Sequence, residues 1–236
     1  MKTKLYTLLS AILLLAGFNH SKAQFQRMIG DGFNVSPGLF LTPVSMIQET
    51  DTKNLVFMFN EDDYRKPLIV KTDSNGVIIW TKTIALNDLH GIKMVLTSSN
   101  TYLVGASLYR NADNYYKIVL MEIDKTGAIT WSKFYDCGYS TTLSALSKTA
   151  DNGYFVVGSP SISGPYGILA MKTNSSGILQ WHKIIKKSAT YFDRPKGFEI
   201  SGDGYYIATT SGYNNYGVFK LNNTGDTVWT REIYSG

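Results

Sequence analysis

All four tryptophans of the chain occupy one recurring motif, in which an Asn or Asp is followed three positions later by Gly and seven positions later by Trp. The tryptophans are 51, 50 and 48 residues apart, and a Lys or Arg stands two positions after each of them. This regularity indicates an internal repeat of about fifty residues, which is typical of proteins built from stacked similar units. The motif residues are Asp73, Gly76 and Trp80; Asp124, Gly127 and Trp131; Asn174, Gly177 and Trp181; and Asn222, Gly225 and Trp229.

Each motif predicts a β-hairpin, because the Asx-to-Gly turn lies between two β-rich runs, such as 118–123 and the segment that carries Trp131. The first half of each repeat contains a second hairpin, for example 143–148 with 154–159, joined by a Gly- and Asn-containing turn. Nothing after the first residues shows sustained helical periodicity. Four short antiparallel strands in each repeat therefore predict an all-β fold, a β-propeller with four four-stranded blades.

The repeat spacing sets approximate boundaries for the blades. Residues 24–236 would form the propeller, with blades at approximately 37–86, 87–137, 138–187 and 188–236. A β-sandwich is the alternative fold, but a sandwich gives no reason for a Trp at the same place in every repeat. In a propeller, a large ring on the outer strand packs between neighbouring sheets. A sugar-binding array is the alternative role for the four tryptophans, and their regularity favours packing.

The Asx-x-x-Gly-x-x-x-Trp pattern resembles the tryptophan-docking motif of quinoprotein-type propellers, and the layout is similar to secreted bacterial propeller proteins exported by the type IX system. The resemblance covers residues 25–233 at the level of blades. It implies a propeller fold and export, and it specifies no catalytic chemistry.

Residues 25–30 resemble the start of a fourth strand of a blade, with Phe25 at the tryptophan position and Arg27 at the basic position. A chain that enters on such a strand needs three further strands after its fourth blade to close a ring. Two interpretations follow: a four-bladed ring with a surplus strand, or the front part of a larger ring. We favour the second.

Residues 1–23 predict a signal peptide, with Lys2 and Lys4 at the start, an apolar run over 8–18, and Ser21-Lys22-Ala23 as the cleavage site. The apolar run is shorter than the ~20 residues of a membrane-spanning helix, so no transmembrane anchor is expected. The expected location is outside the cytoplasm: extracellular, on the cell surface or in the periplasm.

The net charge limits the classes of binding partner, and the cysteine content limits the possible disulfides. The chain has 23 basic and 18 acidic residues, and removal of residues 1–23 would take away three lysines, leaving a net charge of +2. No stripe of Lys and Arg stands out, so nucleic-acid binding is not expected. Cys137 is the single cysteine, so the chain forms no internal disulfide and its stability must come from apolar burial.

The two ends of the predicted blades differ. One end carries short polar turns, whereas the other carries longer loops rich in Tyr and Arg, residues that recognition surfaces favour. We predict that this aromatic loop face binds a protein or carbohydrate ligand. The alternative is that these rings pack between blades, notably Tyr116 and Tyr135. The candidate binding residues are Tyr64, Arg65, Tyr109, Arg110, Tyr115, Tyr139, Tyr166, Tyr191, Phe192, Arg194, Tyr213 and Tyr216.

Catalytic signatures are sparse. His90, expected in a loop between blades, and His182, expected on an outer strand, lie in different elements, which disfavours a metal site or a nucleophilic triad. Asp136 and Asp193 could act as acid and base only if the fold brings them together. The acidic stretch 61–63 is a calcium site or a solvated loop tip. No motif for a cofactor or a metal is present.

Three hypotheses remain for the function. The first is an exported, non-enzymatic binding module that uses the aromatic loop face. The second is a propeller enzyme, glycan-degrading or quinone-dependent, which would need acidic residues at matching positions near the axis. The third is a structural module of a longer surface protein. The repeats do not show matching acidic positions, so we favour the first and third.

Overall fold

The computed structural model describes residues 41–61, 67–86, 88–110, 114–160, 167–185, 193–211 and 215–234. These residues form sixteen β-strands, and none of them lies in a helix. The predicted signal peptide and the segment 25–30 lie outside the described residues.

The strands form four sheets of four, which we call blades 1 to 4. Blade 1 contains β1 (Leu41–Gln48), β2 (Leu55–Glu61), β3 (Pro67–Thr72) and β4 (Ile78–Thr83). Blade 2 contains β5 (Leu89–Leu96), β6 (Tyr102–Arg110), β7 (Tyr115–Ile123) and β8 (Ile129–Tyr135). Blade 3 contains β9 (Thr141–Lys148), β10 (Tyr154–Pro160), β11 (Ile168–Thr173) and β12 (Leu179–Ile185). Blade 4 contains β13 (Asp193–Ser201), β14 (Gly204–Ser211), β15 (Asn215–Leu221) and β16 (Thr227–Tyr234).

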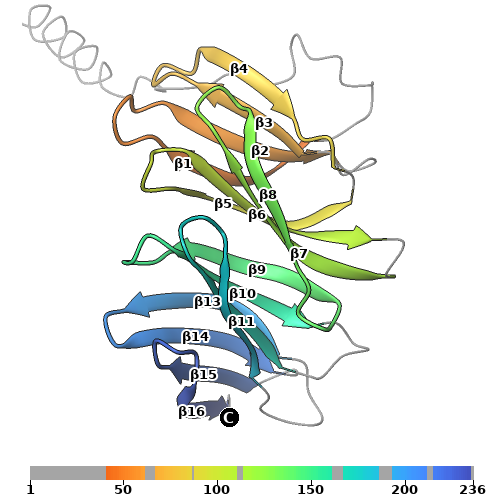
Figure 1. Ribbon diagram of the computed structural model, residues 1–236, viewed down its shortest axis with the longest axis vertical. Helices are drawn as coiled ribbons and strands as arrows, with labels where there is room; N and C mark the ends of the chain where they lie inside the picture. Colours follow the sequence, from red (N-terminus) through yellow and green to blue (C-terminus); the bar gives the residue numbers. More distant parts are fainter. Residues whose placement is uncertain are drawn as a thin grey trace, which may run out of the picture.

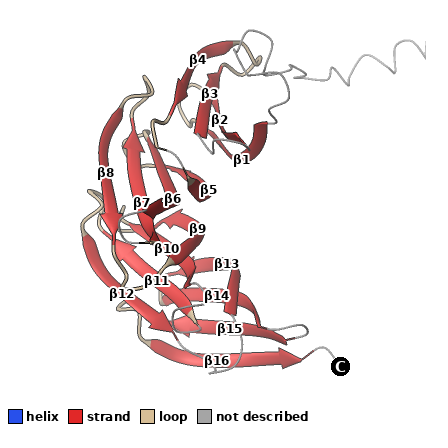
Figure 2. Ribbon diagram, turned by 90° about the vertical axis from the view of Figure 1, so that its right-hand side faces the viewer, coloured by secondary structure: helices blue, strands red, loops and turns tan. Residues whose placement is uncertain are grey.

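Within each blade, every strand pairs antiparallel with the next strand in the chain, so the blade is a simple meander. The blades follow one another in chain order (Figure 1). In the turned view they lie along an open arc, with the fourth strand of each blade on the convex side (Figure 2). This arrangement confirms the predicted all-β propeller architecture with four four-stranded blades.

The Asx residue of each motif builds the turn between the third and fourth strands. In blade 1, Asp73 Oδ1 accepts hydrogen bonds from the backbone N–H groups of Asn75 (2.9 Å) and Val77 (2.8 Å). Gly76 has φ +82°, a left-handed conformation that favours glycine. The strand register shifts just before the turn, between Lys71 and Thr72, and the other three blades repeat this shift. The motif is thus a conserved piece of turn geometry within the chain.

The apolar cores lie between the blades. Successive side chains of a strand point to opposite faces, so each blade contributes one face to the core before it and one to the core after it. Both faces of β11 are buried along its whole length. In the core between blades 3 and 4, Phe155 and Val157 of blade 3 pack with Ile207 and Phe219 of blade 4. Equivalent cores join blades 1 and 2 and blades 2 and 3.

Candidate binding surface

The structure places the motif tryptophans at the boundaries between blades. Trp80 of blade 1 donates its indole N–H to the backbone oxygen of Lys125, in the motif turn of blade 2, over 2.9 Å. A Cβ added to Gly177 would lie 2.7 Å from the Trp131 ring, and one added to Gly225 would lie 2.6 Å from the Trp181 ring. Each of these rings therefore lies directly on the glycine of the next blade, where only a residue without a side chain fits.

The basic residues after Trp131 and Trp181 also reach the next blade. Lys133 donates to the backbone oxygen of Ser176, and Lys183 pairs with the carboxylate of Asp226. The Lys183 ammonium lowers the pKa of Asp226 to about 2, and Thr224 and Asn222 contribute smaller amounts through hydrogen bonds. The repeated motif thus supplies an aromatic contact and a polar contact at every described blade boundary.

The loop end of the propeller is described in part. Of the sequence-predicted binding residues, Tyr109, Arg110, Tyr115, Tyr139 and Tyr216 can be placed with their side chains. Arg194 lies in β13, as does Asp193, and only the backbone of these two is described. The remaining candidates lie outside the described residues: Tyr64, Arg65, Tyr166, Tyr191, Phe192 and Tyr213. Asp62 and Asp63 of the acidic stretch lie outside them as well.

The predicted aromatic residues of blade 2 divide between the two faces of the sheet. Tyr109 pairs with Tyr116 across β6 and β7, and Arg110 pairs with Tyr115. Because side chains alternate along a strand, Tyr109 and Tyr116 point towards blade 3, whereas Arg110 and Tyr115 point towards blade 1. From the sequence, these residues were predicted to lie on one surface. The pleat of the sheet places them on its two opposite faces.

The face towards blade 3 carries a set of rings that we call the Tyr116 cluster, formed by His90, Tyr109 and Tyr116. The Tyr116 ring lies 5.1 Å from Tyr109 and 5.1 Å, edge to face, from His90. The Tyr116 hydroxyl lies 3.3 Å from His90 Nε2. His90 was expected in a loop but lies in β5, whose pairing with β6 at Ser107 brings it beside the tyrosines. All three rings are half-buried, as packing between strands requires.

The face towards blade 1 carries a charged and aromatic set that we call the Asp136 cluster: Arg110, Tyr115, Lys117, Phe134 and Asp136. Tyr115 donates its hydroxyl to Asp136 over 2.6 Å, and the Lys117 ammonium lies 3.0 Å from the same carboxylate. Gly138 donates its backbone N–H to Asp136 over 2.9 Å. The Tyr115 hydrogen bond, together with Gly138 and Lys117, lowers the pKa of Asp136 to about 2. The carboxylate is therefore ionised at neutral pH.

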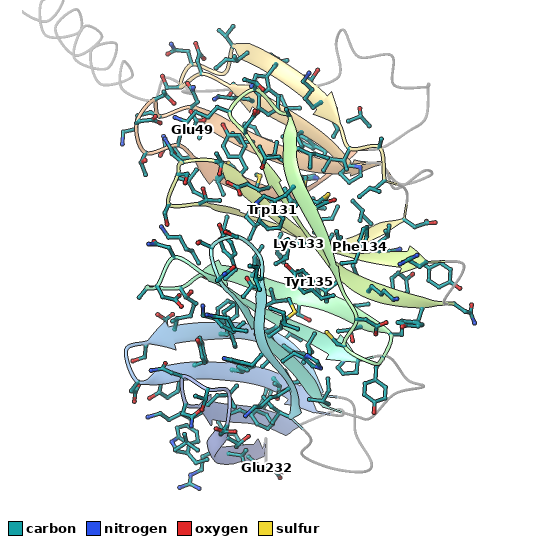
Figure 3. The ribbon with its side chains drawn as sticks, viewed as in Figure 1. Glu49, Trp131, Lys133, Phe134, Tyr135 and Glu232 are labelled. Atoms are coloured by element: carbon teal, nitrogen blue, oxygen red, sulfur yellow. The ribbon has the colours of Figure 1, made fainter. Side chains whose placement is uncertain are left out.

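The Asp136 cluster is exposed where a ligand could reach it. The Arg110 guanidinium lies 5.9 Å from the centre of the Phe134 ring, and 45% of Phe134 is exposed. Asp136 and Arg110 are exposed as well. Phe134 was not foreseen because it lies on β8, one residue before the buried Tyr135 and within the repeated motif region (Figure 3). Its signal is the alternation along β8, where every second side chain faces away from Trp131.

Tyr135 belongs to the core between blades 2 and 3. It is 6% exposed, and its hydroxyl donates to the backbone oxygen of Gly177 over 2.6 Å. Cys137, two residues later, is also buried, and this burial raises the pKa of its thiol to about 12. A thiol in that environment stays protonated and is a poor nucleophile at neutral pH.

Two cavities lie at the opposite end of the propeller, beside the motif turns. One, of about 460 Å³, lies between blades 3 and 4 and is lined by Asp151, Lys172, Trp181 and Tyr205, among others. The Lys172 ammonium is 2.8 Å from Asp151 Oδ2 and 3.1 Å from Gln180 Oε1. A second cavity, of about 470 Å³, occupies the equivalent place between blades 2 and 3. The Lys172 ammonium is thus bonded to side chains of its own blade.

Between blades 1 and 2 the equivalent position holds a buried ion pair. Lys71 lies 2.7 Å from Glu49, which is fully buried and also accepts hydrogen bonds from Tyr102 and Thr52. Burial alone would raise the pKa of Glu49, but these three partners together lower it. The carboxylate is committed to internal contacts, as buried charges require.

A metal centre needs several ligating side chains close together. Within the described ranges, no group of three or more His, Cys, Asp or Glu side chains is close enough to hold a metal ion. In the same part of the chain, no helix is long and apolar enough to cross a membrane.

Comparison with known proteins found no matching family model and no matching curated protein. Among solved structures, one similar protein is a GH43 glycoside hydrolase with an engineered active site and both endo-xylanase and exo-arabinofuranosidase activity. It is 8% identical, with a TM-score of 0.47, over 80% of this chain and 39% of that one. Another is a protein from Lactobacillus plantarum, 15% identical with a TM-score of 0.43 over 81% of this chain and 71% of that one. This chain thus spans well under half of the hydrolase, and at these identities neither comparison bears on substrate or activity.

Proposed function

We propose that this protein is an exported, non-enzymatic propeller module that binds a protein or glycan ligand through the Asp136 cluster on the loop end of blade 2. The observation that carries the proposal is the arrangement of Arg110 and Asp136, which are exposed, with the half-buried Tyr115 hydrogen-bonded to Asp136. Arg110 offers guanidinium donors, Asp136 offers a charged acceptor, and the rings offer apolar area. These are the contacts that recognition surfaces combine.

The cluster is held in place before any ligand arrives. Tyr115 is fixed by its bond to Asp136, and Lys117, 5.1 Å from the centre of the Tyr115 ring, is paired with the same carboxylate. Side chains already ordered in the free protein lose less conformational entropy on binding, which favours affinity. The arrangement therefore suits a surface whose task is recognition.

The protonation states support binding rather than acid–base catalysis. A general acid or base works best when its pKa lies near the working pH. The pKa of Asp136 lies far below neutrality and that of Cys137 far above it. Neither group is poised to exchange a proton at neutral pH.

Export is part of the proposal and rests on the amino-terminal sequence. A charged start, a short apolar run and a small-residue cleavage site precede the propeller. Expression with residues 1–23 in place, followed by cell fractionation and mass determination, tests it. We expect a mature chain that begins at Gln24 outside the cytoplasm, and an uncleaved cytoplasmic chain would contradict export.

Binding is tested with the purified protein on a glycan array and on immobilised cell-surface protein. The variants Tyr115→Ala and Arg110→Ala should weaken any binding found by at least about tenfold, as for residues at the centre of an interface. The control is His182→Ala, because His182 is exposed on β12, away from the Asp136 cluster. A ligand whose affinity is unchanged in both cluster variants would contradict this assignment.

A further inference from the structure

In the described part of the chain, the next blade covers one face of blades 1, 2 and 3, and no described strand covers the corresponding outer face of blade 4. The fourth residue after the motif Trp is apolar in all four repeats: Ile84, Tyr135, Ile185 and Ile233. The first three are 3%, 6% and 7% exposed, because the next blade covers them. Ile233 is 54% exposed. One repeated core position therefore faces outward on blade 4.

Neighbouring positions on the same face of blade 4 are also more exposed than their equivalents in blade 3. Phe155 and Ile168 of blade 3 are fully buried against blade 4. Their equivalents in blade 4, by strand register, are Tyr206, which is half-buried, and Tyr216, which is 49% exposed. The face also carries Trp229, which is half-buried. The outer face of blade 4 thus carries aromatic residues at positions that are buried between blades elsewhere in the chain.

The opposite outer face, on blade 1, shows the same deficit. Leu55 occupies the register position of Tyr102, Tyr154 and Tyr205, which are 0%, 2% and 4% exposed, yet Leu55 is half-buried. Leu68 is half-buried too, whereas its equivalents Val119 and Leu169 are 0% exposed. In the motif turn of blade 1, Ser74 and Asn75 are exposed.

The internal boundaries show how two such faces join. At the boundary of blades 1 and 2 the Trp80 indole N–H reaches Lys125, the second residue of the next turn, and at the boundary of blades 2 and 3 Lys133 reaches Ser176, the third residue of the next turn. On blade 4 the two donors are Trp229 and Arg231, and on blade 1 the equivalent acceptors are the backbone oxygens of Ser74 and Asn75. Arg231 is also positively charged, which complements the negative charge of Asp73 in the motif turn of blade 1.

We propose that the outer face of blade 4 docks onto the outer face of blade 1 of a second copy of this chain. The contact repeats the boundary that already joins blades 1 to 2, 2 to 3 and 3 to 4. Two copies joined at both ends form a ring of eight blades, which lies within the usual range of about 4–8 for propellers. Such a ring has cyclic two-fold symmetry, in which one kind of contact closes on itself. In the open arc of the described blades, blades 1 and 4 lie at the two ends (Figure 2).

Sedimentation of the purified protein over a range of micromolar concentrations tests the association. We expect a monomer–dimer equilibrium with a limiting mass of two chains. Ile233→Lys should weaken the dimer at least about tenfold, because it places a charge in an apolar contact. The matched control is Ile129→Lys, since Ile129 lies on the outer strand of blade 2, is 47% exposed and belongs to neither outer face. A protein that stays monomeric at all concentrations overturns the proposal.

Cross-linking distinguishes this geometry from a symmetric contact between two fourth blades. Arg231→Cys and Val77→Cys are made separately, and the two proteins are mixed with a short bismaleimide, which links two thiols that lie too far apart for a disulfide. We expect a mixed cross-linked dimer, because the Lys183–Asp226 pair, at the equivalent positions, joins blades 3 and 4 through their side-chain ends. Cross-links between two Arg231→Cys chains, in place of mixed ones, overturn the proposed pairing. Cys137 is buried and does not compete.

Discussion

At the residue scale, the motif tryptophans Trp80, Trp131 and Trp181 pack against the apolar cores between consecutive blades. Trp131 lies on Gly177 of blade 3, and its indole N–H donates to Glu122. Trp131→Ala removes this ring from a packed boundary. We expect a loss of about 3 kcal/mol, as for other large aromatic truncations, and a fall in Tm of roughly 6–12 °C for a chain of this size. Scanning calorimetry measures it.

Trp229→Ala is the matched control, because none of the described blades covers the ring face of Trp229 that corresponds to the covered face of Trp131. Measured at a concentration where the protein is monomeric, its Tm should fall by less than half as much as that of Trp131→Ala. Equal losses for the two variants would mean that packing within a blade, rather than between blades, gives the motif its stability.

The motif glycine makes a second prediction at this scale. Gly177 has φ +69°, and an added Cβ would lie 2.7 Å from the Trp131 ring. Gly138 has φ +78°, but an added Cβ there meets no atom within 4 Å. Both substitutions to Ala incur the cost of a left-handed backbone, about 1 kcal/mol. Gly177→Ala should destabilise the protein clearly more than Gly138→Ala in chemical denaturation, and equal effects would contradict the contact.

At the element scale, pH should act on the boundary between blades 3 and 4. The pKa of Asp226 is lowered to about 2, chiefly by Lys183 of the neighbouring blade. A carboxylate with a lowered folded-state pKa stabilises the fold above its unfolded value, about 3.9, and this stabilisation is lost as the pH falls towards 2. We expect Asp226→Asn to flatten the acid limb of the Tm-against-pH curve between these values. An unchanged acid limb would show that the pair contributes nothing to folding.

The strands themselves were predictable from sequence, and their faces were less so. The Asx-to-Gly turns and the alternating apolar runs predicted the hairpins, because those signals are local. His90 was expected in a loop, but pairing with Ser107 extends β5 through it. Tyr109 and Tyr115 were expected to share a surface, but only the register of β6 with β7 decides which face each one takes. Register depends on contacts between strands, which no local pattern records.

At the scale of the whole molecule, the spacing of the tryptophans predicted a propeller because one ring per repeat must have one neighbouring repeat to pack against. Whether a blade face is covered depends on the arrangement of all blades together. The exposure of Ile233 could therefore be found only from the structure, although its repeat position was visible in the sequence. The Asp136 cluster could likewise be found only from the structure, because Phe134 and Arg110 come from strands that are not neighbours in the sheet.

The most direct test of the account is hydrogen exchange at the four indole N–H groups, which give one NMR signal each. The central claim is that each motif Trp joins its blade to the next one. It predicts slow exchange at Trp80, whose N–H group donates to Lys125 of the next blade, and fast exchange at Trp229 in dilute samples. Exchange at Trp229 should slow as the concentration rises and the second copy covers it. Uniformly fast exchange at all four tryptophans would contradict the claim.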